Sequence, residues 1–392
     1  MNIILYDNQD IDRLNPFSTN HSPLELRLGA FTNFERIKNA FNDEYTYTII
    51  VRKEIEELVK NKFSRSIVNP ELIPQGLCIS SSAVLLENDI SEFKDKKNIS
   101  SNGNLISFYL DKDISLNDFN SIVKEKSVIT IESKIKAISN IWDIFDYPEK
   151  ILDEDFNKFI YTSNYKWHPS LIKINEEKIF IGDNSNLKAG IILDASTGPI
   201  IIDQNVVIDH HVSIEGPAYI GKGSFISAGT RIKKNTILGP VCKVGGEISH
   251  SNFLGDSNKV HEGFLGHSYV GEWINIGAGT NSSNLKNNYS TVKVKLEDKE
   301  YDTKQKFIGS FIGDYTRIAI GIALNTGTYI GFGSNLFNHN FNCKYIPMFS
   351  WGNDEKVEFD KFIESISKMK ERRNRNIKDL EIEFIKKLYH RD

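Results

Sequence analysis

The sequence predicts an α/β domain, then a parallel β-helix built from hexapeptide repeats, and finally a short helical extension. Three observations predict this order. Apolar β-rich runs alternate with helical patterns at the start, a six-residue period dominates the middle, and helical spacing returns near the C-terminus. At 392 residues, the chain is also longer than one ordinary compact core supports. We therefore expect more than one domain.

The first domain is expected over residues 1–165. Its strand-like runs are NIILYD, TYTIIV, GLCISSSAVLL and LISFYLD, and TYTIIV is followed by the helical pattern RKEIEELVKNKF. Such alternation is typical of an α/β sheet domain. The composition changes over residues 165–178, which we take as the domain boundary.

A six-residue period defines the second domain, expected over residues 179–350. The period has one aliphatic residue in each unit, at Ile202, Ile208, Ile214, Ile220, Ile226, Ile232, Leu238 and Val244, and again at Ile312, Ile318, Leu324, Ile330 and Leu336. Four residues after each member of the first run comes a small or β-branched residue, from Val206 and Val212 to Cys242 and Ile248. This pattern is typical of a parallel β-helix. A β-sandwich would instead need turn signals every 8–12 residues.

Two segments depart from this period. Residues 284–307 break the register and contain the alternation from Thr291 to Leu296, which predicts a loop or β-arm. Residues 354–392 are charged and carry apolar residues at helical spacing, which predicts C-terminal helices. Their basic cluster is expected to be a solvated face and consists of Lys370, Arg372, Arg373 and Arg375.

The charge balance and the cysteines exclude several classes of protein. The 48 Lys and Arg residues nearly balance 52 Asp and Glu residues, so no broad basic field predicts nucleic-acid binding. No secretory signal and no stretch of about 18 apolar residues is present, so we expect a cytoplasmic protein without membrane insertion. Cys78, Cys242 and Cys343 lack metal-ligand spacing and are expected to be packing thiols.

Residues 257–289 interrupt the repeat and are rich in His, Asn and Gly, as expected where a regular scaffold carries a site. His261 and His267 lie in this segment. A histidine with a pKa of about 6.5 is neutral at cytoplasmic pH and can accept a proton from an attacking amine. By residue type alone, a single histidine in a β-helix is more often a hydrogen-bonded coil residue than a catalyst.

The string from Ser257 to Asn284 resembles the acetyltransferase domain of the bifunctional bacterial enzymes that combine glucosamine-1-phosphate acetyltransferase and N-acetylglucosamine-1-phosphate uridylyltransferase activities. The resemblance implies a left-handed β-helix. It also implies that His261, three residues before the triplet Phe264-Leu265-Gly266, is the general base, and that Asn275 and Asn284 contact the sugar. A variant, Bacteroidetes-type form of the family resembles nearly the whole chain, through KAGIILDASTGPI, GPVCKVGGEISHS, GEWINIGAGTNSSNLKNNY and YIPMFSWG.

The same resemblance implies an aminosugar 1-phosphate as acceptor, with Phe264 beside it. The segment before His261 is shorter than in the better-known enzyme, which leaves Lys243 and Lys259 as the nearest basic residues for the phosphate. Leu285 replaces an aromatic residue after the second asparagine, so the sugar itself can differ.

Acetyl-CoA is the implied donor, bound in a groove between β-helices of a homotrimer. Gly279, Ala319 and Ala323 are the candidates to line this groove. Small residues at coil corners equally permit tight turns and close stacking of the coils, so a purely structural role stays open.

For residues 1–165 the resemblance implies a sugar nucleotidyltransferase fold, which would use Mg²⁺ if active. The glycine-rich phosphate loop after the first strand is missing, because the segment reads NQDIDRLNPFSTNHSPLELRLG. Arg13 and Arg27 are the candidates to bind the nucleotide phosphates. Asp143 is a candidate metal ligand, although a helix-capping role is the more common one. The domain is thus either an altered nucleotidyltransferase or a structural remnant.

Three functions remain open. The first is acetylation of an aminosugar 1-phosphate coupled to formation of a nucleotide sugar of the UDP-N-acetylglucosamine type. The second is acetyl transfer alone, to another aminosugar or to a nucleotide sugar for surface polysaccharide. The third is a β-helix scaffold, non-catalytic or binding zinc, for which about three histidines must converge among His210, His211, His250, His261 and His267.

Overall fold

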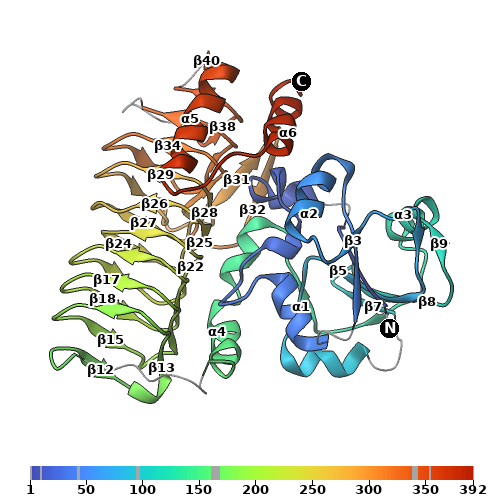
Figure 1. The fold of residues 1–392 in the computed structure, drawn as a ribbon, viewed down its shortest axis with the longest axis horizontal. Helices are drawn as coiled ribbons and strands as arrows, with labels where there is room; N and C mark the ends of the chain where they lie inside the picture. Colours follow the sequence, from blue (N-terminus) through green and yellow to red (C-terminus); the bar gives the residue numbers. More distant parts are fainter. Residues whose placement is uncertain are drawn as a thin grey trace.

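The computed structural model describes residues 2–8, 11–41, 45–93, 98–159, 168–337, 343–352 and 355–391. An α/β domain, a β-helix and a pair of C-terminal helices follow one another along the chain and pack together (Figure 1). Residues 165–167 of the predicted boundary between the first two lie outside the described residues. The first strand of the β-helix is β12 (Ile172–Ile174), which pairs with β15.

The N-terminal domain has a seven-stranded sheet of order β10-β7-β8-β5-β1-β2-β3. In that order the strands span Ile131–Glu132, Ile99–Ser101, Asn104–Leu110, Gly76–Ser80, Asn2–Tyr6, Thr46–Ile50 and Ile67–Val68. The neighbours β5, β1, β2 and β3 run parallel, and β8 runs antiparallel to β5. Because β1 connects to β2 on one side and pairs with β5 on the other, the sheet has a topological switch point between β1 and β5.

Among the described residues of this domain, four α-helices and two small sheets accompany the large sheet. The helices are α1 (Asn33–Phe41), α2 (Glu56–Lys62), α3 (Leu116–Glu125) and α4 (Pro148–Phe156). The small sheets pair β4 (Leu72–Ile73) with β9 (Ile114–Ser115), and β6 (Ala83–Val84) with β11 (Lys136–Ala137). The expected α/β domain is confirmed.

The second domain is the parallel β-helix of the left-handed type that the sequence analysis expected, with three faces that we number in chain order. Face 1 has the order β13-β16-β19-β22-β25-β28-β33-β36-β38, face 2 β14-β17-β20-β23-β26-β29-β34-β37-β39-β40, and face 3 β12-β15-β18-β21-β24-β27-β30-β35. The strands of face 1 span Ile179–Ile181, Ile200–Ile202, Ala218–Ile220, Thr236–Leu238, Asn252–Gly255, Tyr269–Glu272, Ser310–Ile312, Thr328–Ile330 and Tyr345–Ile346.

The other two faces consist mostly of two- and three-residue strands. Those of face 2 span Asn186–Leu187, Val207–Ile208, Phe225–Ile226, Lys243–Val244, Asn258–Lys259, Asn275–Ile276, Arg317–Ile318, Asn335–Leu336, Ser350–Trp351 and Glu355–Lys356. Those of face 3, after β12, span Ile192–Asp194, Ser213–Glu215, Arg231–Ile232, Glu247–Ser249, Phe264–Gly266, Asn281–Ser282 and Ala323–Leu324.

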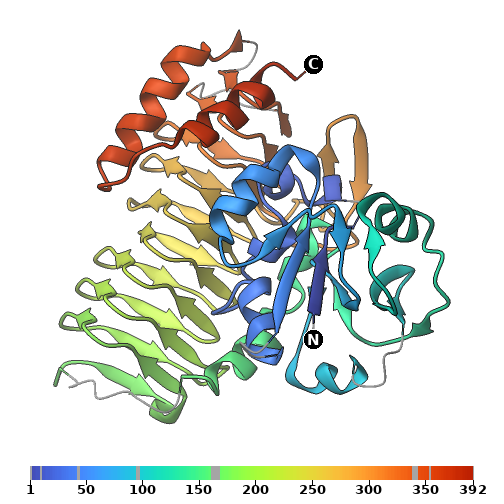
Figure 2. The same cartoon turned by 45° about the vertical axis from the view of Figure 1, so that its right-hand side comes forward.

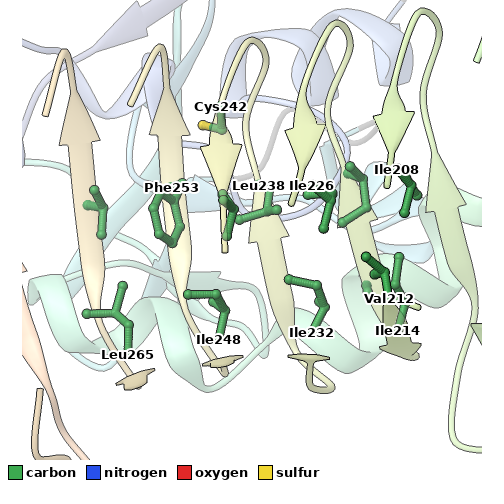
Figure 3. Close-up of a cluster of buried hydrophobic side chains, with 14 of the residues drawn as sticks. Ile208, Val212, Ile214, Ile226, Ile232, Leu238, Cys242, Ile248, Phe253 and Leu265 are labelled. Carbon is green, nitrogen blue, oxygen red and sulfur yellow. The ribbon is translucent and has the colours of Figure 1, made fainter. Parts of the chain in front are cut away.

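The aliphatic residues of the repeat form one continuous column inside the β-helix (Figure 3). Ile208, Ile214, Ile226, Ile232 and Leu238 are all fully buried there. Burial of each such side chain stabilises the fold by about 1.5–3 kcal/mol relative to exposure. Every sixth position is therefore kept aliphatic along this run. After Val244 the six-residue spacing fails, and Phe253, Leu265 and Val270 continue the column at other intervals.

An antiparallel arm leaves the β-helix between faces 3 and 1, as the alternation predicted. It consists of β31 (Lys293–Leu296) and β32 (Lys299–Asp302). Val292, Val294 and Leu296 are buried in a cluster that includes Trp142 of the N-terminal domain.

The N-terminal domain covers face 1 (Figures 1 and 2). Leu152 of α4 packs with Ile201, Tyr219 and Ile237 of that face. The amide of Asn252 donates to the carbonyl oxygen of Arg27 at 2.6 Å. Faces 2 and 3 carry no such cover among the described residues.

Helices α5 (Phe359–Glu371) and α6 (Asp379–Tyr389) cover the turns between faces 1 and 2. The predicted solvated face is wrong for Lys370, which is buried and binds both carboxylate oxygens of Glu381 at 2.6 and 2.7 Å. Arg373 donates to the carbonyl of Val241, and Arg375 binds Asp256 at 2.6 Å. Arg373 and Arg375 attach the helices to the β-helix, whereas Lys370 joins α5 to α6.

Cys78 and Cys242 are buried, as expected of packing thiols, whereas Cys343 is exposed and the expectation is wrong for it. Among the described helices, none is long and apolar enough to cross a membrane.

Candidate functional site

His261 lies in the turn between faces 2 and 3, after β26 and before β27, and its side chain is exposed. Two residues earlier, Lys259 occupies a place in the buried column, since it pairs with Val244 in the register of β23 and β26. Its ammonium group donates to the carbonyl oxygens of His261 at 2.9 Å and Gly245 at 3.1 Å. Burial lowers the pKa of Lys259 to about 8. Lys259 therefore fixes the His261 turn from inside, which does not favour a direct contact with phosphate.

At the other end of β27, Asn284 lies beside Phe264 and His267. The Asn284 amide nitrogen lies 2.9 Å from Nδ1 of His267. Since an amide nitrogen can only donate, this contact puts the proton of a neutral His267 on Nε2. A Cβ at Gly266 would lie 2.5 Å from the Phe264 ring and 2.6 Å from the Asn284 amide nitrogen. Only glycine lets these two side chains approach each other there.

His267 is held neutral by its surroundings. Its ring stacks on His250 with centroids 4.5 Å apart and on Phe307 with centroids 5.3 Å apart. Burial, with a smaller contribution from His250, lowers the pKa of His267 to about 3. At neutral pH the side chain is thus a fixed hydrogen-bond partner of Asn284.

The predicted acceptor residues are only partly brought together. On face 3, His261 precedes β27 and Asn284 follows β30, the neighbouring strand of the next coil. The Phe264 ring and the Asn284 amide meet over Gly266. Asn275 instead lies exposed on face 2, where its Oδ1 accepts from the Asn258 amide at 2.7 Å. Within one chain, Asn275 therefore faces a different side of the β-helix.

Lys243 is exposed on β23 of face 2, one coil before Lys259. A different pair of lysines lies next to Asn284. Lys286 and Lys344 line a pocket of about 420 Å³ together with Ser283, Leu285, Asn287, Asn288, Asn325 and Thr326. Burial and the nearby Lys286 ammonium lower the pKa of Lys344. The sequence analysis missed this pair because its members are far apart in sequence.

The expected acetyl-CoA residues lie around the next turns of the same corner. Gly279 has φ +72° and its N–H donates to the carbonyl of Glu262 at 2.9 Å, which stacks it directly on the His261 turn. Ala319 and Ala323 flank the following turn, where Ala319 is half-buried and Ala323 exposed. Between them Ile320 has 65% of its surface exposed, so this corner presents apolar surface.

A second candidate site lies in the N-terminal domain, at the carboxyl ends of β1 and β5. The cavity measures about 440 Å³, and its lining includes Asn8, Arg13, Ser82, Lys126, Lys136 and Asp143. Ligands of open α/β sheets bind at this kind of switch point. Three cationic side chains beside it suit an anionic ligand such as a nucleotide.

The two predicted arginines differ in position. Arg13 lines the cavity, and its guanidinium carbon lies 5.4 Å from the centre of the Tyr301 ring in the arm. Arg27 is buried elsewhere, where it donates to the carbonyl of Ala30 and lies over Tyr219. It does not line the cavity, so its expected role in nucleotide binding has no geometric support.

Asp143 lines this cavity and also caps a 3-10 helix spanning Ile141–Phe145. Its Oδ2 accepts from the backbone N–H groups of Ser139 at 2.9 Å and Asn140 at 2.8 Å. Mg²⁺ is commonly held by one or two carboxylates together with substrate phosphates. Asp143 fits such a role through Oδ1, with Oδ2 retained by the cap.

The segment that replaces the glycine-rich loop packs against the β-helix. It forms 3-10 turns at Ile11–Leu14, Phe17–Thr19 and Pro23–Glu25. Phe17 packs edge-on against Tyr269 at 6.0 Å, and the Asn20 amide donates to Asp314 at 2.9 Å. This segment therefore joins the domains, and the phosphates of a nucleotide would depend on side chains instead.

The histidines suggested for zinc do not converge within one chain. His250 and His267 stack in parallel, and the rings of His210 and His211 are 6.3 Å apart. In the part of the chain that the structure describes, the group of three suited to a metal is His21, Glu272 and Asp314. The five histidines thus give no support to a zinc scaffold.

Comparisons with known proteins show what each part of the chain is similar to. The family model for sugar nucleotidyl transferase matches residues 3–163. A bifunctional sugar-1-phosphate nucleotidylyltransferase/acetyltransferase of Sulfurisphaera tokodaii is 28% identical over 69% of this chain and 60% of its own length. The bifunctional protein GlmU of Thermodesulfovibrio yellowstonii is 30% identical over 40% of this chain and 31% of its own length. The bifunctional protein GlmU of Methanocaldococcus jannaschii is 26% identical over 75% of this chain and 71% of its own length.

The chain spans less than two thirds of the length of the first two of these relatives. The match to the Sulfurisphaera protein nevertheless covers more of this chain than the sugar nucleotidyl transferase domain does. The chain therefore matches the sugar nucleotidyl transferase family over residues 3–163, and over more than two thirds of its length it is similar to a bifunctional sugar-1-phosphate nucleotidylyltransferase/acetyltransferase.

Proposed function

We propose that the β-helix transfers an acetyl group from acetyl-CoA to the amino group of an aminosugar 1-phosphate of the glucosamine 1-phosphate type. The observation that carries this proposal is the arrangement along β27. An exposed His261 precedes this strand, and the oriented amide of Asn284, from the next coil, lies near the Phe264 ring over Gly266.

In this proposal His261 is the general base. It accepts a proton from the acceptor's amino group, so that the nitrogen lone pair can attack the thioester carbonyl carbon. Acetyl-CoA, when bound, supplies the acetyl group and leaves as the free thiol. Asn284 hydrogen-bonds a hydroxyl or phosphate oxygen of the acceptor, and Phe264 packs against the sugar ring. Gly279, Ala319 and Ala323 are the proposed contacts for the donor.

The phosphate of the acceptor is assigned to Lys286 and Lys344 rather than Lys259. Their pocket adjoins Asn284, whereas Lys259 is only 1% exposed and bound to two carbonyls. Lys286 lies close enough to Lys344 to lower its pKa, so an anion bound between the two ammonium groups would relieve their repulsion. Lys243, exposed on face 2, keeps a secondary role as a contact from a neighbouring copy.

A homotrimer is part of the proposal. Asn275 and Lys243 lie on face 2, and they reach an acceptor bound on face 3 only if a second chain supplies them. Faces 2 and 3 are the faces that the N-terminal domain leaves open for such an assembly. We assign the protein to the cytoplasm, where its proposed substrates are made.

For the N-terminal domain we propose nucleotidyl transfer to the acetylated sugar 1-phosphate, giving a nucleotide sugar of the UDP-N-acetylglucosamine type. Arg13, Lys126 and Lys136 would bind the phosphates in place of a glycine-rich loop. Mg²⁺ held through Asp143 would neutralise charge on the phosphates. The second candidate function is acetyl transfer alone. It is favoured by the segment after β1, which packs against the β-helix where a nucleotidyltransferase would have its phosphate-binding loop.

The test of the acetyl transfer is thiol release from acetyl-CoA with glucosamine 1-phosphate as acceptor. We expect His261→Ala to lower the rate by about 10²-fold or more, the usual loss for a general base. His210→Ala is the matched control, because His210 is another exposed histidine in a turn between faces 2 and 3. Equal rates for wild type and His261→Ala would remove His261 from the mechanism. Absence of release by wild type would redirect the proposal to another aminosugar.

A further inference from the structure

A cavity of about 360 Å³ lies where the N-terminal domain, the β-helix and the C-terminal helices meet. It is separate from both sites described above. His21 and Glu25 reach it from the N-terminal domain, Glu272 and Asp314 from successive turns between faces 1 and 2, and Glu381 from α6. Charged side chains are thus enclosed at a place where all three parts of the molecule join.

Three of these side chains are arranged as metal ligands. One donor atom each of His21, Glu272 and Asp314 lies within 4.8 Å of the other two. Nε2 of His21 lies 2.9 Å from Oδ2 of Asp314, a hydrogen-bond distance that brings both atoms to one point of the cavity. The backbone N–H of Glu272 donates to Oδ1 of Asp314 at 2.9 Å, which fixes the carboxylate. Gly271 is needed here, since a Cβ would lie 2.2 Å from that same oxygen.

The second nitrogen of His21 has the partner that metal-binding histidines usually have. Nδ1 lies 2.8 Å from Oε2 of Glu25, so the carboxylate orients the ring and leaves Nε2 directed at Asp314. A carboxylate, a histidine and a metal in series are the common arrangement around protein-bound cations. Lys62 in turn binds Glu25.

The charges leave room for a cation. Glu25, Glu272 and Asp314 carry three negative charges, and Lys62 supplies one positive charge among them. The carboxylate of Glu272 is only loosely paired, with Lys62 at 3.9 Å. If the imidazole of His21 is neutral, these side chains carry a net charge of −2, which one divalent cation would neutralise.

Two further oxygen atoms around the cavity lack donors. Oδ1 of Asn20 and Oδ1 of Asp256 are buried without a hydrogen-bond partner, and Asp256 is only 9% exposed. Water molecules bound to a cation would supply the hydrogen-bond donors that such buried acceptors require.

We propose that His21, Glu272 and Asp314 bind one divalent cation that clasps the N-terminal domain to the β-helix. The donor set of one imidazole and two carboxylates suits Zn²⁺ better than Mg²⁺, which prefers oxygen ligands alone. The ion is structural, because its ligands come from two domains and lie outside both candidate sites. It therefore differs from any Mg²⁺ at Asp143.

A proton is the competing occupant. Burial lowers the pKa of His21, but Glu25 and Asp314 outweigh it and raise the value to about 10. An imidazolium could therefore hold the two carboxylates without any metal. The test must separate a proton from a bound cation.

The test is Zn²⁺ binding by the full-length protein, measured by equilibrium dialysis and elemental analysis after chelator treatment, without sugar, nucleotide or acetyl-CoA. We expect one Zn²⁺ per chain and at least about 10-fold weaker binding by Glu272→Gln. Glu272 is partly exposed, so this variant should fold. The matched control is Glu247→Gln, whose carboxylate pairs with Arg231 on face 3.

Thermal unfolding gives a second measurement on the same proteins. Zn²⁺ should raise the melting temperature of wild type and Glu247→Gln but not of Glu272→Gln, because a ligand stabilises only the state that binds it. Wild type without bound Zn²⁺, or Glu272→Gln with wild-type affinity, would overturn the proposal in favour of a proton-bridged cluster. Since no substrate is present, this result is independent of the proposed acetyl transfer.

Discussion

The ammonium group of Lys259 lies 2.9 Å from the carbonyl oxygen of His261 and reaches it from inside the β-helix. A lysine in an aliphatic column is costly, because burial disfavours its charge. Its two carbonyl partners compensate for this cost and at the same time define the turn that carries the proposed base. The position of His261 is thus coupled to a buried side chain rather than to surface contacts.

Replacement of Lys259 should therefore lower activity although the side chain cannot touch the acceptor. In Lys259→Met the column keeps an unbranched side chain, but the carbonyls of His261 and Gly245 lose a donor. We expect kcat for thiol release to fall by about 10-fold, in line with a loss of about 1.4 kcal/mol from one charged hydrogen-bond network. The KM for the acceptor should change little. A rise in KM with unchanged kcat would show that Lys259 binds the acceptor instead.

His267 predicts a pH dependence of stability. Its pKa is lowered to about 3 in the folded protein, whereas an unfolded histidine titrates near 6.5. As the pH falls from 7.5 to 5.5, the unfolded chain takes up a proton at this residue and the folded chain does not. The free energy of unfolding should therefore fall by about 1.4 kcal/mol from this residue alone.

Urea unfolding at both pH values measures this effect as a difference between wild type and His267→Ala. The variant should lose less stability on acidification, while the exposed-histidine variant His210→Ala should behave like wild type. Equal acid sensitivity of wild type and His267→Ala would mean that His267 is protonated in the folded state.

The repeat column predicts a contrast between two isoleucines of face 3. Ile232 is fully buried, whereas Ile192 has 38% of its surface exposed. We expect Ile232→Ala to lower the free energy of unfolding by about 2–5 kcal/mol, through lost burial and the cavity left behind. Ile192→Ala should cost less than about 1 kcal/mol. Urea unfolding followed by circular dichroism compares them, and equal losses would contradict the assigned register.

This column is the part of the fold that was most fully predictable. An aliphatic residue at every sixth position has few structural solutions, so residues 202–244 could be placed before any coordinates. Lys259 could not, because a lysine ordinarily indicates a solvated position and its burial depends on two carbonyls that only the coil geometry brings within reach. The same reason explains Lys370, whose partner Glu381 lies on another helix.

The residues of the candidate site that belong to one short sequence segment were predictable. Those that come together only because the coils stack in register were not. His261, Phe264 and Asn284 follow from the string 257–284, and the structure positions them on two neighbouring coils of face 3. His250 and Phe307 join them only because the coils stack His267 between two distant segments. The role of Asn275 depends on quaternary structure, since face 2, on which it lies, can complete the site only in an assembly of several chains.

Arg13 and Arg27 give the sharpest test of the N-terminal domain, because both follow the first strand and only Arg13 lines the cavity. Arg13→Ala should weaken binding of UTP with Mg²⁺ by about 10-fold, the usual loss for one charged contact, as measured by calorimetry on the full-length protein. The control Lys112→Ala removes an exposed cation outside that lining and should bind like wild type. Unchanged binding by Arg13→Ala would exclude this cavity as the phosphate site. No binding of any nucleoside triphosphate by wild type would favour acetyl transfer alone, with the segment after β1 serving to join the two domains.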